Sequence, residues 1–241
     1  FMSTSKQYFD NLKSNQLSNI DIIINNLNQA GITNKFSQSA LLAICAKESD
    51  LIPKVEKSYK GTKNTSIRKI FGKHVSDLND GDLDELKKND IKFFDKVYGI
   101  FSKRDKDSDG SVIGNSIEGD GHRYRGRGFN QLTFKSNYRE IGNKIGQDLV
   151  QNPDILNDDV SVAAKALIQY YISSFKSAPK DALQAFGISK SSTSIQTINS
   201  IDNLKSAVQA FYQATQGWGG WKNKVVKYEQ DSYTTSDGSL V

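Results

Sequence analysis

The chain has 241 residues, of which 37% are hydrophobic and 24% charged, and its single cysteine is Cys45. This composition excludes a disulfide-built scaffold, a collagen-like chain and a coiled-coil rod. The 32 basic and 27 acidic residues give a net charge of +5, which favours anionic partners without selecting one. No apolar run reaches the roughly 18 residues that a membrane span needs.

Apolar residues recur at helical spacing through most of the chain, and no long run alternates as a strand does. A first helix is indicated from Leu17 to Leu27 and should end at Gly31. A second helix runs from about Ser37 to Leu51, and Pro53 should stop it. Further helices are predicted near 64–71, 82–89, 90–101, 135–145, 158–175, 178–186, 194–200, 202–216 and 219–229. We therefore expect an all-α fold.

The sequence favours one catalytic domain over residues 1–229, followed by a polar, flexible tail over 230–241. Residues 102–128 are charged and rich in glycine, and this stretch is too long for an idle connection inside a compact domain. We expect two helical subdomains with a substrate groove between them.

Glu48 is the first candidate catalytic residue. With 100° per residue, it lies within about 60° of Leu41, Ile44 and Cys45 on its helix. Desolvation on an apolar face raises the pKa of a carboxylic acid, which suits a general acid. The alternative is a glutamate of the last helical turn that points to solvent beside Lys47.

Glu56 follows the break at Pro53, so it need not share the helix of Glu48 and can face it across a cleft. One protonated and one ionised carboxyl group are the minimum pair for glycoside hydrolysis. Because 27 acidic residues give many such pairs, this pair alone does not decide the function.

A second informative stretch, residues 126–138, reads GRGFNQLTFKSNY. Glycines on both sides of Arg127 let the backbone come close to a ligand. Gln131, Thr133 and Asn137 offer neutral donors and acceptors that suit sugar hydroxyl and acetamido groups. The alternative is an arginine-anchored turn before a helix.

Several segments together resemble glycoside hydrolase family 19, and within it the chitinase-like lysozymes of the phage endolysin type. They are LLAICAKES (41–49), Val55-Glu56, GDGHRYRGRG (119–128), Gln131–Thr133 and Asn137-Tyr138. The resemblance implies a lysozyme-like helical fold with Glu48 as the general acid and Glu56 as the general base. It also implies that Thr133 helps to hold the attacking water.

The same resemblance places Gln131, Asn137 and Tyr138 at positions that contact sugar, with Arg127 as a substrate-binding residue that organises the groove. Two departures from the family pattern stand beside Glu48. Lys47 replaces the usual histidine, and Asp50-Leu51 replaces the glycines that commonly follow Ser49. A lysine facing Glu48 would lower the pKa of its carboxyl group, but Lys47 should point away around the helix.

The resemblance implies a peptidoglycan hydrolase, an N-acetylmuramidase that cleaves the β-1,4 bond between N-acetylmuramic acid and N-acetylglucosamine. The family inverts the anomeric centre, so water attacks opposite the leaving oxygen. Three alternatives stay open: a chitinase of the same fold, a lytic transglycosylase that needs one carboxylate, and a non-catalytic cell-wall-binding module.

We expect no metal or other cofactor. Asp105, Asp107 and Asp109 imitate the first half of an EF-hand loop and are a weak calcium alternative, since Ser116 stands where a glutamate is needed. His74 and His122 lack ligand neighbours at zinc spacing.

The expected partners are peptidoglycan glycan strands and a phage tail or secretion machine as carrier, with no nucleic acid, and the chain should be a monomer. Residues 2–12 are polar and lack a signal-peptide core, so we expect synthesis in the cytoplasm. The wall would then be reached by holin release, tail delivery or contractile secretion.

Overall fold

The computed structural model describes residues 11–32 and 35–174, which form two compact units. Residues 11–52 and 160–174 belong to the first unit, and residues 53–159 form the second. The helices predicted at 178–186, 194–200, 202–216 and 219–229 lie outside the described residues, as does the tail over 230–241.

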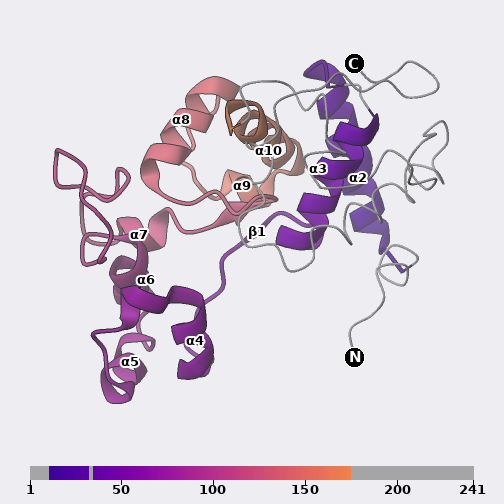
Figure 1. The fold of residues 1–241 in the computed structure, drawn as a ribbon. Coiled ribbons are helices and arrows are strands. Elements are labelled where there is room, and N and C mark those ends of the chain that lie inside the picture. Colours follow the sequence, from indigo (N-terminus) through magenta and orange to yellow (C-terminus); the bar gives the residue numbers. More distant parts are fainter. Residues whose placement is uncertain (1–10, 33–34, 175–241) are drawn as a thin grey trace, which may run out of the picture. The chain divides into compact units, whose positions relative to one another are not determined.

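The described part of the chain is mainly helical, as predicted (Figure 1). The first unit contains α2 (Ser14–Gln29), α3 (Lys35–Ser49) and α10 (Val160–Ser174). The second unit contains α4 (Asn64–Phe71), the 3-10 helix η1 (Gly72–Val75), α5 (Asp80–Leu86), α6 (Asp90–Tyr98), α7 (Asp120–Arg123), α8 (Lys135–Ile145), α9 (Ile155–Asp158), β1 (Lys54–Val55) and β2 (Arg127–Gly128). No helix in the described residues has the length and apolar character that crossing a bilayer requires.

In the first unit, α2 packs against both α3 and α10. Ile23 and Leu27 of α2 and Leu167 of α10 are buried, as the helical spacing of their apolar residues requires. The predicted end of α2 is confirmed, because Gly31 adopts a left-handed φ of +79° just beyond the helix.

The end of α3 differs from the prediction. The helix ends at Ser49, four residues before Pro53, so the proline does not terminate it. It ends there because Asp50 and Leu51 adopt left-handed φ angles of +58° and +59°. A left-handed residue other than glycine costs about 1–2 kcal/mol, so this turn needs support from elsewhere.

One hydrophobic cluster of the second unit lies among α4, η1, α5 and α6. It consists of Ile67, Phe71, Val75, Leu83, Phe93, Phe94 and Val97. Two tyrosines, Tyr59 and Tyr98, are partly buried against this cluster. Tyr59 stacks on Phe93 with ring centroids 5.1 Å apart. This cluster thus packs against the rings of Tyr59 and Tyr98, which carry the two phenol hydroxyl groups.

The glycine-rich stretch over 102–128 is fixed to the helices on either side of it. The buried Asn115 donates to the Tyr98 carbonyl (2.9 Å) and accepts from the Lys135 amide (3.0 Å). The buried Asp95 of α6 accepts from the amides of Gly119 (2.6 Å) and Gly121 (2.9 Å). These bonds join α6 to α7 and α8, so the segment is a built part of the second unit.

Candidate functional site

A short sheet fixes the backbone of Glu56 against the second motif. Strands β1 and β2 pair antiparallel, with Lys54 opposite Gly128 and Val55 opposite Arg127. The Glu56 amide continues this ladder by donating to the Gly126 carbonyl at 2.7 Å. Segments that lie about 70 residues apart in the sequence therefore meet at Glu56.

The half-buried Glu56 carboxylate accepts hydrogen bonds from three donors. Its Oε1 atom accepts from the hydroxyl groups of Tyr59 (2.9 Å) and Tyr98 (3.0 Å), and its Oε2 atom accepts from the Gly126 amide (3.2 Å). Burial and the adjacent Glu56 charge raise the pKa of both tyrosine hydroxyl groups. The two phenols therefore remain protonated donors at neutral pH.

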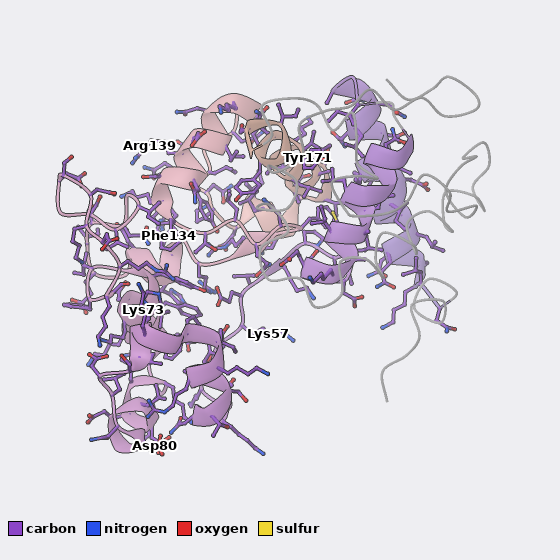
Figure 2. All side chains as sticks on the ribbon, in the orientation of Figure 1. Lys57, Lys73, Asp80, Phe134, Arg139 and Tyr171 are labelled. Carbon is purple, nitrogen blue, oxygen red and sulfur yellow. The ribbon has the colours of Figure 1, made fainter. Side chains whose placement is uncertain are left out.

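Tyr98 is itself held on its far side. Its ring meets that of Phe134 edge-on, with centroids 5.5 Å apart, and stacks on Phe94 at 6.0 Å. The Arg104 guanidinium lies over the rings of both Tyr98 and Phe134. Phe134 is labelled in Figure 2 and directly precedes α8. This packing restricts the motion of the Tyr98 ring, whose hydroxyl donates to Glu56.

Position 126 is closely approached by two side chains. A Cβ atom there would lie 2.8 Å from Oε1 of Gln131 and 3.3 Å from Oε2 of Glu56. Any side chain would push away one of the groups that the turn brings together. Gly126 thus lets backbone, carboxylate and amide come into close contact.

The structure brings three of the predicted polar residues into one hydrogen-bonded turn beside β1. Gln131, which has a φ of +54°, donates to the carbonyls of Lys54 (2.9 Å) and Gly128 (3.2 Å). Thr133 donates its hydroxyl to the Gln131 carbonyl at 3.0 Å, and Asn137 donates to the Thr133 carbonyl at 2.7 Å. All three side chains are partly exposed and available to a ligand.

Arg127 and Tyr138 do not share that partly exposed surface. Their burial fits the predicted role of Arg127 in organising the groove, and it does not fit the predicted sugar contact of Tyr138. Arg127 is 4% exposed and Tyr138 is fully buried. Arg127 pairs with Asp154 (3.1 Å) and donates to the Arg123 carbonyl and the Tyr138 hydroxyl. Tyr138 donates to the Arg125 carbonyl at 2.5 Å. In this structure the two residues hold the turn from within and offer no surface for a sugar.

Glu48 belongs to the first unit, in the last turn of α3. Its side chain is exposed, whereas that of the next residue, Ser49, is buried, so Glu48 does not lie on the buried face of the helix. Partial desolvation nevertheless raises the pKa of the Glu48 carboxyl group, and the Lys47 ammonium opposes this rise. Solvent screens the shift because the side chain is exposed.

The sequence alone missed the two tyrosines that hold Glu56. Tyr59 lies three residues after Glu56, so a local polar contact was a readable signal. Tyr98 lies 42 residues away, and only the packing of α6 brings it to the site.

The calcium alternative gains no support from the loop geometry. In the described residues, no group of three or more histidine, cysteine, aspartate or glutamate side chains gathers to hold a metal ion. The Asp107 and Asp109 carboxylates instead accept from the Ser111 hydroxyl at 2.9 and 2.6 Å, and Asp107 also accepts from the Gly114 amide. These acidic groups serve to shape the loop.

Comparison with known families finds a match to glycoside hydrolase family 19, described as class I chitinase, over residues 89–213. The match covers more than half of the chain and includes Gln131, Thr133 and Asn137. Glu48 and Glu56 lie before it, so their assignment depends on their own surroundings and on the sequence motifs.

Individual relatives match over short segments. Acidic endochitinase Q of Nicotiana tabacum is 44% identical over 50 residues, which are 21% of this chain and 20% of the relative. The acidic endochitinase of Petunia hybrida is 46% identical over 52 residues, 22% of this chain and 20% of the relative. The chain thus spans about a fifth of the length of these relatives.

One solved structure, a bacterial family 19 chitinase, aligns over 88% of this chain and 93% of its own. Its TM-score is 0.41 and its sequence identity is 17%. A similarity of this size carries no argument about the site.

Proposed function

The chain belongs to glycoside hydrolase family 19, and from this premise we propose that it hydrolyses a β-1,4-linked glycan of N-acetylated sugars. The observation that carries the proposal is the Glu56 carboxylate, fixed by two phenols and a backbone amide close to Gln131. A carboxylate fixed in this way suits a general base.

In the proposed reaction, Glu48 gives a proton to the leaving oxygen and Glu56 takes one from water. Partial desolvation raises the pKa of the Glu48 carboxyl group above its ordinary value, which is the direction that a general acid needs. Thr133 is proposed to help hold the attacking water, and Gln131 and Asn137 to bind sugar hydroxyl or acetamido groups.

We propose peptidoglycan as the substrate, with cleavage between N-acetylmuramic acid and N-acetylglucosamine. The net charge of +5 supports this choice, because it favours approach to an anionic cell wall. Chitin is the second candidate and is supported equally by the comparisons, since the relatives are named as chitinases.

The test is digestion of purified peptidoglycan and of chitin oligomers, with fragments identified by mass spectrometry before and after borohydride reduction. The wild type is compared with Glu48→Gln and Glu56→Gln. Glu140→Gln is the control, because Glu140 is an exposed residue of α8 that pairs with Lys144. We expect loss of about 100- to 10,000-fold in turnover for the first two variants and none for the control.

The products decide between the substrates and the alternatives. Reducible N-acetylmuramic acid ends from peptidoglycan support the muramidase, and turnover confined to chitin oligomers supports the chitinase. Anhydro ends would move the protein to the lytic transglycosylases, for which Glu56 should be dispensable. Binding of cell wall without release of any fragment would leave a non-catalytic module.

A further inference from the structure

We propose that Gln16 and Asn19 of α2 are positioning residues for Glu48, because their side-chain amides hold the left-handed turn that directly follows it. The inference depends on the proposed role of Glu48 as the acid. The two amides touch the backbone beyond Glu48 and act on its carboxyl group only through the direction of the turn.

The contacts are specific to this turn. Gln16 donates to the Asp50 carbonyl at 3.0 Å, and Asn19 donates to the Leu51 carbonyl at 2.9 Å. Both amide side chains are almost completely buried, at 5% and 7% exposed. A buried amide is retained where its bonds replace water, and the NH2 groups of both side chains find that bond in this turn. The Gln16 oxygen also accepts from the Lys13 amide at the start of α2, at 2.8 Å.

The turn needs this support because its residues are unusual for its shape. Asp50 and Leu51 both have φ near +60°, a conformation that glycine adopts without steric cost. Leu51 is fully buried, so its side chain anchors the turn in the core at the expense of backbone freedom. The amide donors of α2 therefore stabilise a backbone conformation that glycine would adopt without such support.

The turn is continuous with the last turn of α3. The amides of Asp50 and Leu51 donate to the carbonyls of Ala46 and Cys45, at 3.0 and 3.3 Å. Glu48 lies between these donors and acceptors along the chain, so loosening the turn frays the helical residues that orient its side chain.

Among the described residues, the charged group that shifts the Glu48 pKa is Lys47 of the same helix, which opposes the rise caused by desolvation. Burial raises the pKa of the Cys45 thiol, and the Glu48 charge adds to that rise. At this point α2 contributes neutral amides. Loss of the amides should therefore act through geometry and solvation, and a Glu48 that gains water should titrate at lower pH.

The test compares Asn19→Leu with Asn26→Leu, a matched change on the same helix. Asn26 donates to the Ile22 carbonyl of α2 itself and does not reach the turn. We expect Asn19→Leu to lower kcat about tenfold with little change in KM, since small misplacements of a catalytic group reduce the rate strongly. Asn26→Leu should leave both values unchanged. Adding Asp50→Gly to Asn19→Leu should restore much of kcat, because glycine accepts the turn unaided.

A second readout does not require activity. Titration of the Glu48 carboxyl carbon by NMR should give a lower pKa in Asn19→Leu and an unchanged one in Asn26→Leu. If the wild type turns over no glycan while this shift appears, the proposed function fails and the positioning stands. If Asn19→Leu keeps both kcat and the Glu48 titration, the positioning role is wrong. Should Asn19→Leu not fold, Gln16→Met removes the other donor to the turn, together with the acceptor of the Lys13 amide at the start of α2.

Discussion

The two candidate carboxyl groups are held by opposite means. Glu56 receives three hydrogen bonds directly on its oxygen atoms, from a nearby tyrosine, a distant tyrosine and a glycine amide. Glu48 is oriented by the turn after it, whose carbonyls are bound by two amides of α2. The position of Glu56 therefore depends on contacts to its own carboxylate, whereas the position of Glu48 depends on the backbone of its helix and of the turn after it.

The largest effect should come from adding a side chain at Gly126, which lies in close contact with the Glu56 carboxylate. In Gly126→Ala, the new Cβ atom would lie 2.8 Å from Gln131 and 3.3 Å from Glu56, so the turn must shift. We expect kcat to fall about 100-fold, as a displacement near 1 Å at a catalytic group can produce. The control is Gly61→Ala, where a Cβ meets nothing within 4 Å. Equal activity of the two variants would contradict the close-contact argument.

A smaller effect should follow from removing one donor. Tyr98→Phe and Tyr59→Phe each delete one hydrogen bond to Oε1 of Glu56 and keep the ring packed. We expect about a tenfold fall in kcat for each, the size of one hydrogen bond to a charged group, with KM nearly constant. Tyr124→Phe is the control, because its hydroxyl donates to the Val150 carbonyl. A change in KM without a change in kcat would point to substrate contact instead.

The smallest effect should be on the free energy of unfolding, through the left-handed turn that follows Glu48. In Asp50→Gly, the strain of a left-handed aspartate is removed, and we expect the free energy of unfolding to rise by about 0.5–1 kcal/mol. Gly31→Ala makes the reverse change at a left-handed position of the same unit and should destabilise the protein by about 1 kcal/mol. Urea denaturation measures both. Destabilisation by Asp50→Gly would show that the turn carries no such strain.

The described helices of seven residues or more could be predicted from the sequence, and the shorter elements could not. The apolar spacing of α8 and α10 extends over several turns and identifies them. By contrast, α7 has four residues and each strand has two, too few for any period to appear.

The site residues followed the same division. Residue type suggested Gln131, Thr133 and Asn137 as polar groups that suit a sugar. The structure joins them by hydrogen bonds with their side chains partly exposed, and their roles toward a substrate stay predictions. It could not show that Arg127 and Tyr138 are buried, because their partners lie on other segments. The sequence left the exposure of Glu48 open between two readings, since angular position near the end of a helix does not determine what covers a side chain.

One unit is a continuous stretch of the chain and the other is built from two separate stretches, so we expect them to fold in a fixed order during synthesis. The second unit is one continuous stretch, residues 53–159, so it can fold once that stretch has left the ribosome. The first unit cannot, because α2 packs against α10, which begins at Val160. We expect the residues around Glu56 to fold first. Helices α2 and α3 can complete their packing only after α10 has been synthesised. The unit that contains Glu48 should therefore stay incompletely packed for longer on the growing chain.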